Sequence, residues 1–186
     1  MSQTEKTYSK VTEAEEMIEK LVKKYPELLW QIKPRIVTVL GVENKERSKN
    51  CHKLAQVKAV RGAEKAVMQI HNVDVRYIIE LYWSDWNAWS VELKQWIVLH
   101  ELLHVSFEIG KVIKHDCEDF RIILDAVGVD WTNKVDGLPN LLREDVKFNL
   151  NLRPNVPSEE EVELANDEIL PDDSEKEESP EKENGS

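Results

Sequence analysis

Apolar residues in the first 60 positions recur with two different spacings. After Thr12 they follow helical spacing until Pro26, and Thr12 with Glu15 has the residue types of a capping box. Together these features predict an amphipathic helix. Residues 35–42 and 54–60 are instead rich in β-branched side chains and are bounded by proline, glycine or polar runs. Runs of that kind predict two strands.

Residues 73–83 carry the strongest strand pattern of the chain. Valine, tyrosine, isoleucine, leucine and tryptophan occupy every second position from Val75 to Trp83, so one face of this strand is apolar. Residues 84–87 follow with side chains that favour a turn. The strand is either a fully paired core element or an edge that an extended peptide could join.

Two helices are predicted after this turn. The first runs from about Ser90 through Phe107, with Gly110 placed to terminate it. The second opens with Asp116 and Asp119 at the positions of an N-cap and its N3 partner. The order of one helix, three strands and two helices predicts an α+β domain, in which a small mixed sheet packs on the long helix.

The long helix carries the sequence His100-Glu101-Leu102-Leu103-His104. Histidines four positions apart lie on one face of a helix, so both imidazoles can bind one metal ion. The glutamate between them is placed to accept a proton from a metal-bound water, as in HExxH metallopeptidases. Catalytic zinc normally has three protein ligands and one open position, so a third ligand must come from elsewhere.

His115 is the better candidate for the third ligand. Glu108 continues the four-residue spacing, but it lies about 12 Å along the helix axis from His100, too far for one ion. His115 follows the glycine break, so the chain can turn back toward the first two histidines. Asp119 could orient an imidazole, act as an alternative ligand or cap a helix. Cys117 is interpreted as a packed free cysteine in preference to a zinc thiolate.

The stretch from Trp96 to Asn133 resembles the putative phage metallopeptidase family. Members of that family combine an HELxH helix with an HDxxDF segment and a short helix that ends near Gly-x-Asp-Trp. The matching residues of this chain are His100, Glu101, Leu102, His104, His115, Asp116, Asp119, Phe120, Gly128, Asp130 and Trp131. The HExxH motif with a later histidine and phenylalanine is also distantly similar to SprT-like protease domains. The resemblance implies a zincin-like fold and zinc bound by three histidines.

Charge is distributed unevenly along the 186 residues. The net charge of −11 equals that of residues 158–186 alone, which contain 13 acidic residues and 2 lysines. This segment has no aromatic side chain, which predicts a disordered tail that could dock a partner. We expect a flexible N-terminus (1–10), a zincin-like metallopeptidase domain (11–157) and the acidic disordered tail (158–186).

Membrane association is not expected. Residues 1–10 are polar and contain no hydrophobic signal segment, and no apolar run is long enough to span a membrane. Two cysteines make no disulfide framework, so a cytoplasmic location is expected, in the host cell if the chain is phage-encoded. A basic loop at residues 45–53, continuing to Lys58 and Arg61, could contact nucleic acid, although a solvated loop is the simpler interpretation.

These features predict a zinc-dependent metallopeptidase that hydrolyses a protein or peptide substrate. His100, His104 and His115 would hold Zn²⁺, and Glu101 would act as the general base. The alternative is a non-catalytic, zinc-stabilised interaction or regulatory module. A structural zinc site needs no general base, so the presence of Glu101 favours the enzyme.

Overall fold

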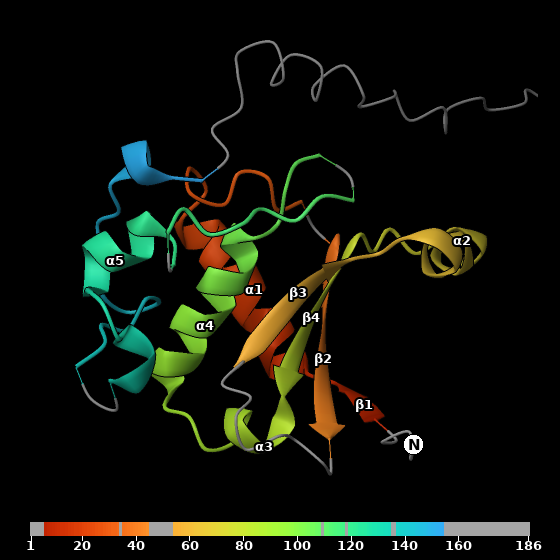
Figure 1. The fold of residues 1–186 in the computed structure, drawn as a ribbon, viewed down its shortest axis with the longest axis horizontal. Coiled ribbons are helices and arrows are strands. Elements are labelled where there is room, and N and C mark those ends of the chain that lie inside the picture. Colours follow the sequence, from red (N-terminus) through yellow and green to blue (C-terminus); the bar gives the residue numbers. More distant parts are fainter. Residues whose placement is uncertain are drawn as a thin grey trace, which may run out of the picture. The chain divides into compact units, whose positions relative to one another are not determined.

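A four-stranded sheet with helices packed on it forms the frame of the protein (Figure 1). The computed structural model describes residues 6–154 except 34, 45–53, 109, 118, 135 and 136. The strands are β1 (Lys6–Lys10), β2 (Val37–Asn44), β3 (Ala55–Ala59) and β4 (Tyr77–Tyr82). The helices are α1 (Thr12–Lys24), α2 (Gly62–Ile70), α3 (Trp83–Trp86), α4 (Val91–Leu103) and α5 (Arg121–Val127), followed by 3-10 turns at Trp131–Asn133 and Leu150–Leu152.

The strand order in the sheet is β1-β2-β4-β3. β2 and β4 run parallel, whereas β1 pairs with β2 and β3 pairs with β4 in antiparallel fashion. The predicted α+β class and mixed sheet are therefore confirmed. The edge interpretation of residues 73–83 is wrong, because β4 has a partner strand on both sides. Within the described residues, β3 is the edge strand next to β4.

One face of the sheet is apolar because residues alternate along β4. Tyr77, Ile79 and Leu81 are at most 1% exposed and point to the core, where α1 and α4 contact each other and the sheet. Burying a side chain of this size contributes about 1.5–3 kcal/mol. Nine of the 13 residues of α4 are buried, so both the sheet and the segments around α5 fix the orientation of this helix.

The N-terminal part of the domain differs from the prediction. Residues 6–10, assigned from the sequence to a flexible N-terminus, form β1 and pair with β2. The predicted capping box is wrong, because Val11 is the N-cap and no side chain caps α1. Val11 is 2% exposed and its backbone N–H donates to Val39 O at 3.2 Å. Burial of Val11 therefore places the start of the helix one residue earlier.

Other boundaries shift by a few residues. β2 starts at Val37 and continues to Asn44, and β4 lacks residues 73–76 of the predicted strand. The sequence pattern does not predict α2, whose residues are not buried. Among the described residues, no helix has the length and apolar character needed to cross a lipid bilayer. The predicted tail (158–186) and basic loop (45–53) lie outside the described residues.

Candidate metal centre

Helix α4 positions the first half of the site. The helix begins close to the predicted position. Its N-cap is Ser90, whose hydroxyl oxygen accepts a hydrogen bond from a backbone N–H of the first turn at 3.2 Å. The helix ends at Leu103, so the predicted continuation to Phe107 is wrong. His100 and His104 lie one turn apart on the same face, and their ring centroids are 5.0 Å apart.

The chain reverses immediately after α4. Val105 is fully buried and pairs with Val112 in an isolated antiparallel bridge. The backbone N–H of Ile113 donates to His104 O at 2.8 Å, and His104 Nδ1 lies 2.6 Å from Ile113 O. This reversal, rather than the predicted glycine, ends the helix. It also returns His115 to the histidines of α4.

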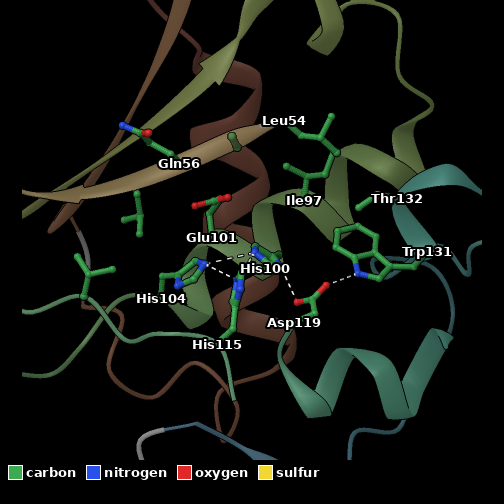
Figure 2. Close-up of a pocket in the computed structure, with 13 residues that line it drawn as sticks. Leu54, Gln56, Ile97, His100, Glu101, His104, His115, Asp119, Trp131 and Thr132 are labelled. Carbon is green, nitrogen blue, oxygen red and sulfur yellow. Dashed lines mark hydrogen bonds and ion pairs between the residues drawn. The ribbon is translucent and has the colours of Figure 1, made fainter. Parts of the chain in front are cut away.

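The Nε2 atoms of His100, His104 and His115 converge on one point (Figure 2). Their separations are 3.2 Å for His104–His100, 3.1 Å for His115–His100 and 3.0 Å for His115–His104. Tetrahedral zinc binds imidazole nitrogen at about 2.0–2.1 Å, which places two such nitrogens about 3.3 Å apart. The three imidazoles therefore fit a single ion of this size.

Hydrogen-bond partners set the tautomers of two of these histidines. His104 Nδ1 donates its hydrogen to Ile113 O, because a carbonyl oxygen can only accept. His100 Nδ1 lies 3.0 Å from the carboxylate oxygen Oδ1 of Asp119, a contact that favours a hydrogen on Nδ1. A neutral imidazole that donates through Nδ1 carries its lone pair on Nε2. At least two lone pairs thus point to the same place, as metal coordination requires.

Burial favours the neutral form of His104 and His115. It is the main cause that lowers the pKa of His104 to about 4, and the nearby His100 and His115 act in the same direction. Burial and the proximity of His100 likewise lower the pKa of His115. Neutral imidazole is the form that binds a metal ion, so the donor set matches the geometry.

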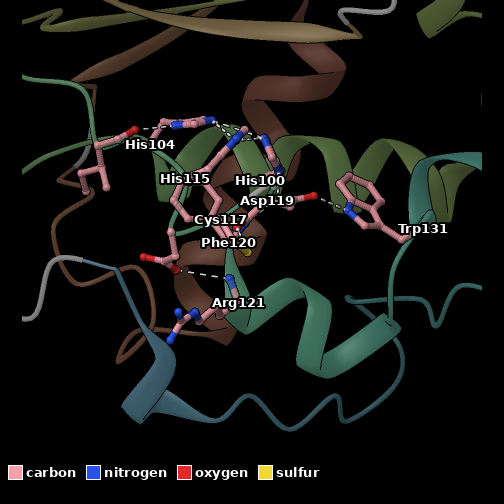
Figure 3. A network of polar contacts seen from close by, with 10 residues as sticks. His100, His104, His115, Cys117, Asp119, Phe120, Arg121 and Trp131 are labelled. Atoms are coloured by element: carbon pink, nitrogen blue, oxygen red, sulfur yellow. Dashed lines mark hydrogen bonds and ion pairs between the residues drawn. The ribbon is translucent and has the colours of Figure 1, made fainter.

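Asp119 connects the histidines to the segment beyond α5. Its Oδ1 atom faces His100 Nδ1, and its Oδ2 atom accepts a hydrogen bond from Trp131 Nε1 at 2.7 Å (Figure 3). Burial alone would raise the pKa of this carboxyl, but His100, Trp131 and a backbone N–H lower it to about 2. An ionised carboxylate therefore orients His100. Asp119 lies outside α5, so its predicted N3 capping role is wrong.

Phe120 forms an apolar floor against the three imidazoles (Figure 3). Its ring centroid lies 5.4 Å from that of His100, 4.7 Å from His104 and 5.0 Å from His115. Phe120 is fully buried and is the N-cap residue of α5. Asp116 is therefore not the N-cap, although its carboxylate accepts the first backbone N–H of α5 at 3.2 Å.

Glu101 lines a cavity of about 520 Å³ that also exposes the three histidines (Figure 2). Helix α4 forms one wall, and the edge strand β3 contributes Ala55, Gln56 and Val57 to the opposite wall. Glu101 itself is only 5% exposed. A carboxylate, three imidazole nitrogens and the edge strand of the described sheet therefore adjoin the same space.

Two alternative ligands from the sequence lie outside the histidine cluster. Glu108 follows the end of the helix, is exposed and pairs with Lys111. Cys117 is also exposed, so the prediction of a packed cysteine is wrong, and its thiol donates to Asp119 O at 3.2 Å. The structure brings together His100, His104 and His115, the set that the sequence favoured.

Two features of the site were not predicted from the sequence. The indole of Trp131 is bound to Asp119, and β3 forms a cavity wall. Trp131 belongs to the Gly-x-Asp-Trp pattern of the family, but a sequence pattern does not reveal the hydrogen-bond partner of its indole. The place of β3 in the cavity wall could not be predicted, since alternation along a strand does not determine its neighbours in the sheet.

Comparisons with known proteins place the chain in a family. No curated protein and no solved structure matches it. The similarity to SprT-like domains therefore stays a prediction. A family model described as putative phage metallopeptidase matches residues 6–139, which include the whole sheet, the three histidines and Trp131. The chain belongs to this putative phage metallopeptidase family.

Proposed function

We propose that the protein is a zinc-dependent metallopeptidase with a zincin-like arrangement, encoded by a phage as the family description suggests. One observation carries the proposal. Three imidazole nitrogens lie 3.0–3.2 Å apart beside the carboxylate of Glu101, in a cavity bordered by an edge strand. Carboxylate and zinc ligands adjoin in this way where a metal-activated water attacks a peptide carbonyl.

His100, His104 and His115 would hold the metal. Bound zinc would supply Lewis acidity and lower the pKa of a water molecule toward 7. The Asp119 carboxylate orients His100, and the Ile113 carbonyl orients His104, so the Nε2 atoms need no rearrangement to bind. Pre-oriented ligands of this kind distinguish a built site from histidines that are neighbours by chance.

Glu101 is the general base of the proposed reaction. Its position one residue after His100 directs its carboxylate into the cavity beside the imidazoles (Figure 2). It accepts a proton from the attacking water and delivers that proton to the leaving amine. Its low exposure limits the bulk water that competes for this proton.

The edge strand β3 supplies a binding surface for the substrate. An extended peptide can pair with a free edge through backbone hydrogen bonds, which act on any sequence. Because Ala55, Gln56 and Val57 line the same cavity as Glu101, a peptide paired with β3 would place a peptide bond near that carboxylate. The fully paired β4 cannot serve this purpose.

The test compares Glu101→Gln with the wild-type protein, measuring zinc content and cleavage of a denatured protein substrate. We expect full zinc content and a loss of cleavage of at least 100-fold, because only the proton acceptor is removed. Glu108→Gln is the matched control, since Glu108 lies near the site but outside the cavity, and it should keep both properties. Unchanged cleavage by Glu101→Gln would refute the role of Glu101. Bound zinc without any cleavage by the wild type would favour a non-catalytic zinc module.

A further inference from the structure

The cavity has an apolar compartment on one side of the three histidines. Leu54, Ile97, Trp131 and Thr132 gather there (Figure 2). Leu54 directly precedes β3, Ile97 lies one turn before Glu101 on α4, and the other two belong to the 3-10 turn after α5. Three separate parts of the fold therefore enclose a space beside the carboxylate and the imidazoles.

The described residues that form the walls of this compartment offer no ion-pair partner for a charged group. No lysine or arginine is among the described residues that line the cavity, and its only carboxylates are Glu101 and Asp119. Asp119 is already bound by Trp131 and faces His100. A charged substrate side chain would lose its hydration here without a new ion pair, whereas an apolar side chain would gain by leaving water.

The compartment is also pre-shaped. Trp131 is 3% exposed, its indole is held by Asp119, and its ring packs at centroid distances of 5.8 Å from His100 and 6.5 Å from Trp96. Ile97 is 2% exposed. Leu54, like Thr132, is only partly buried. The rear walls are thus fixed, and Leu54 can be changed without disturbing the core.

We infer that this compartment receives a large apolar side chain of the substrate, at one of the two positions that flank the cleaved bond. The inference rests on the proposed function and adds a substrate class to it: peptides with Leu, Ile, Met or Phe at that position. Leu54, Ile97 and Trp131 are the residues that determine the preference. Truncation of the substrate side chain to alanine should lower kcat/KM by about 10- to 100-fold.

The first test incubates the zinc-loaded full-length protein with a diverse peptide library and identifies the cleavage sites by mass spectrometry. We expect large apolar residues to dominate one flanking position, and matched peptides with Leu or Ala there to differ by about 10- to 100-fold. Cleavage with equal use of charged residues at both flanks would overturn this inference and leave the proposed function standing. A complete lack of cleavage would overturn the proposed function, and this inference with it.

A charge placed in the compartment gives the second test. Leu54→Lys should lower cleavage of the Leu peptide by at least about 10-fold and raise cleavage of a matched Glu peptide relative to it. The control Val67→Lys changes an exposed valine of α2, outside the cavity, and should keep the wild-type preference. An unaltered preference in a folded Leu54→Lys protein would overturn the assignment. If thermal unfolding shows that this variant is not folded, Leu54→Ala replaces it. An unchanged ratio between cleavage of the Leu peptide and of the Ala peptide would then overturn the assignment in the same way.

Discussion

Asp119 is the residue at which the metal site and the cavity wall meet. One of its carboxylate oxygens faces His100, and the other accepts the indole hydrogen of Trp131. Orientation of the imidazole and position of the tryptophan therefore depend on the same group. The sequence left the role of Asp119 open between ligand, orienting group and helix cap, and the structure supports the orienting role.

Asp119→Asn tests that role. The amide keeps the size of the side chain but removes the negative charge next to His100, so we expect zinc affinity to fall by about 10- to 100-fold. Competition with a chromogenic chelator measures this affinity. Asp125→Asn is the control, since Asp125 is an exposed residue of α5 outside the cavity lining. Equal affinities of the two variants would contradict the orienting role.

His115→Ala tests the third ligand. A ligand contributes more than the residue that orients it, so zinc affinity should fall by at least about 100-fold. His71→Ala removes an exposed histidine at the end of α2 and should leave the affinity unchanged. Full zinc affinity in His115→Ala would contradict the assignment of the three imidazoles as one donor set.

Individual helices and strands could be predicted where the burial of one face produces a regular spacing of apolar residues in the sequence. β4 buries apolar side chains at every second position from Tyr77 to Leu81, and α4 has a capping serine, so the existence and type of both elements follow from the sequence. β1 and α2 bury no residue, which leaves no hydrophobic period to detect. The early end of α4 depends on the pairing of Val105 with Val112 and on the bonds between His104 and Ile113, which are tertiary contacts.

Substitution of Gly41 tests how closely β2 packs with its neighbours. A methyl group at this position would lie 2.8 Å from Trp83 Cε3 in α3, 3.0 Å from Ser9 Oγ and 3.1 Å from Val11 Cγ2. Gly41→Ala should therefore destabilise the fold by about 1–3 kcal/mol, measured by urea unfolding. A midpoint equal to that of the wild type would show that α3 does not pack on the sheet as described.

At the scale of the molecule, the hydrophobic core does not depend on a metal. The core cluster combines side chains of α1, the sheet, α4 and α5, so the histidines lie on a scaffold that is already packed. The sequence predicts the α+β class and the three histidines of the site. It does not predict the strand order. β2 and β4 are neighbours in the sheet although β3 lies between them in the sequence, and this pairing is set by the crossover connection and not by any local pattern.

The protein should consequently stay folded after metal removal. Unlike a zinc finger, which unfolds without its ion, the chelated protein should unfold cooperatively on heating. Zinc should raise the midpoint, because free zinc at a hundredfold excess over its Kd stabilises the native state by about 2.7 kcal/mol. Thermal unfolding with and without chelator measures both effects. Loss of all cooperative unfolding in chelator would indicate a structural zinc site.

X-ray absorption at the zinc edge of the purified full-length protein tests the central claim most directly. Our account predicts nitrogen and oxygen ligands at about 2.0–2.1 Å, with outer-shell scattering from three imidazoles. A zinc–sulfur contribution at about 2.3 Å would instead implicate a cysteine, Cys51 or Cys117. That result, or scattering from fewer than three imidazoles, would contradict a site made by His100, His104 and His115.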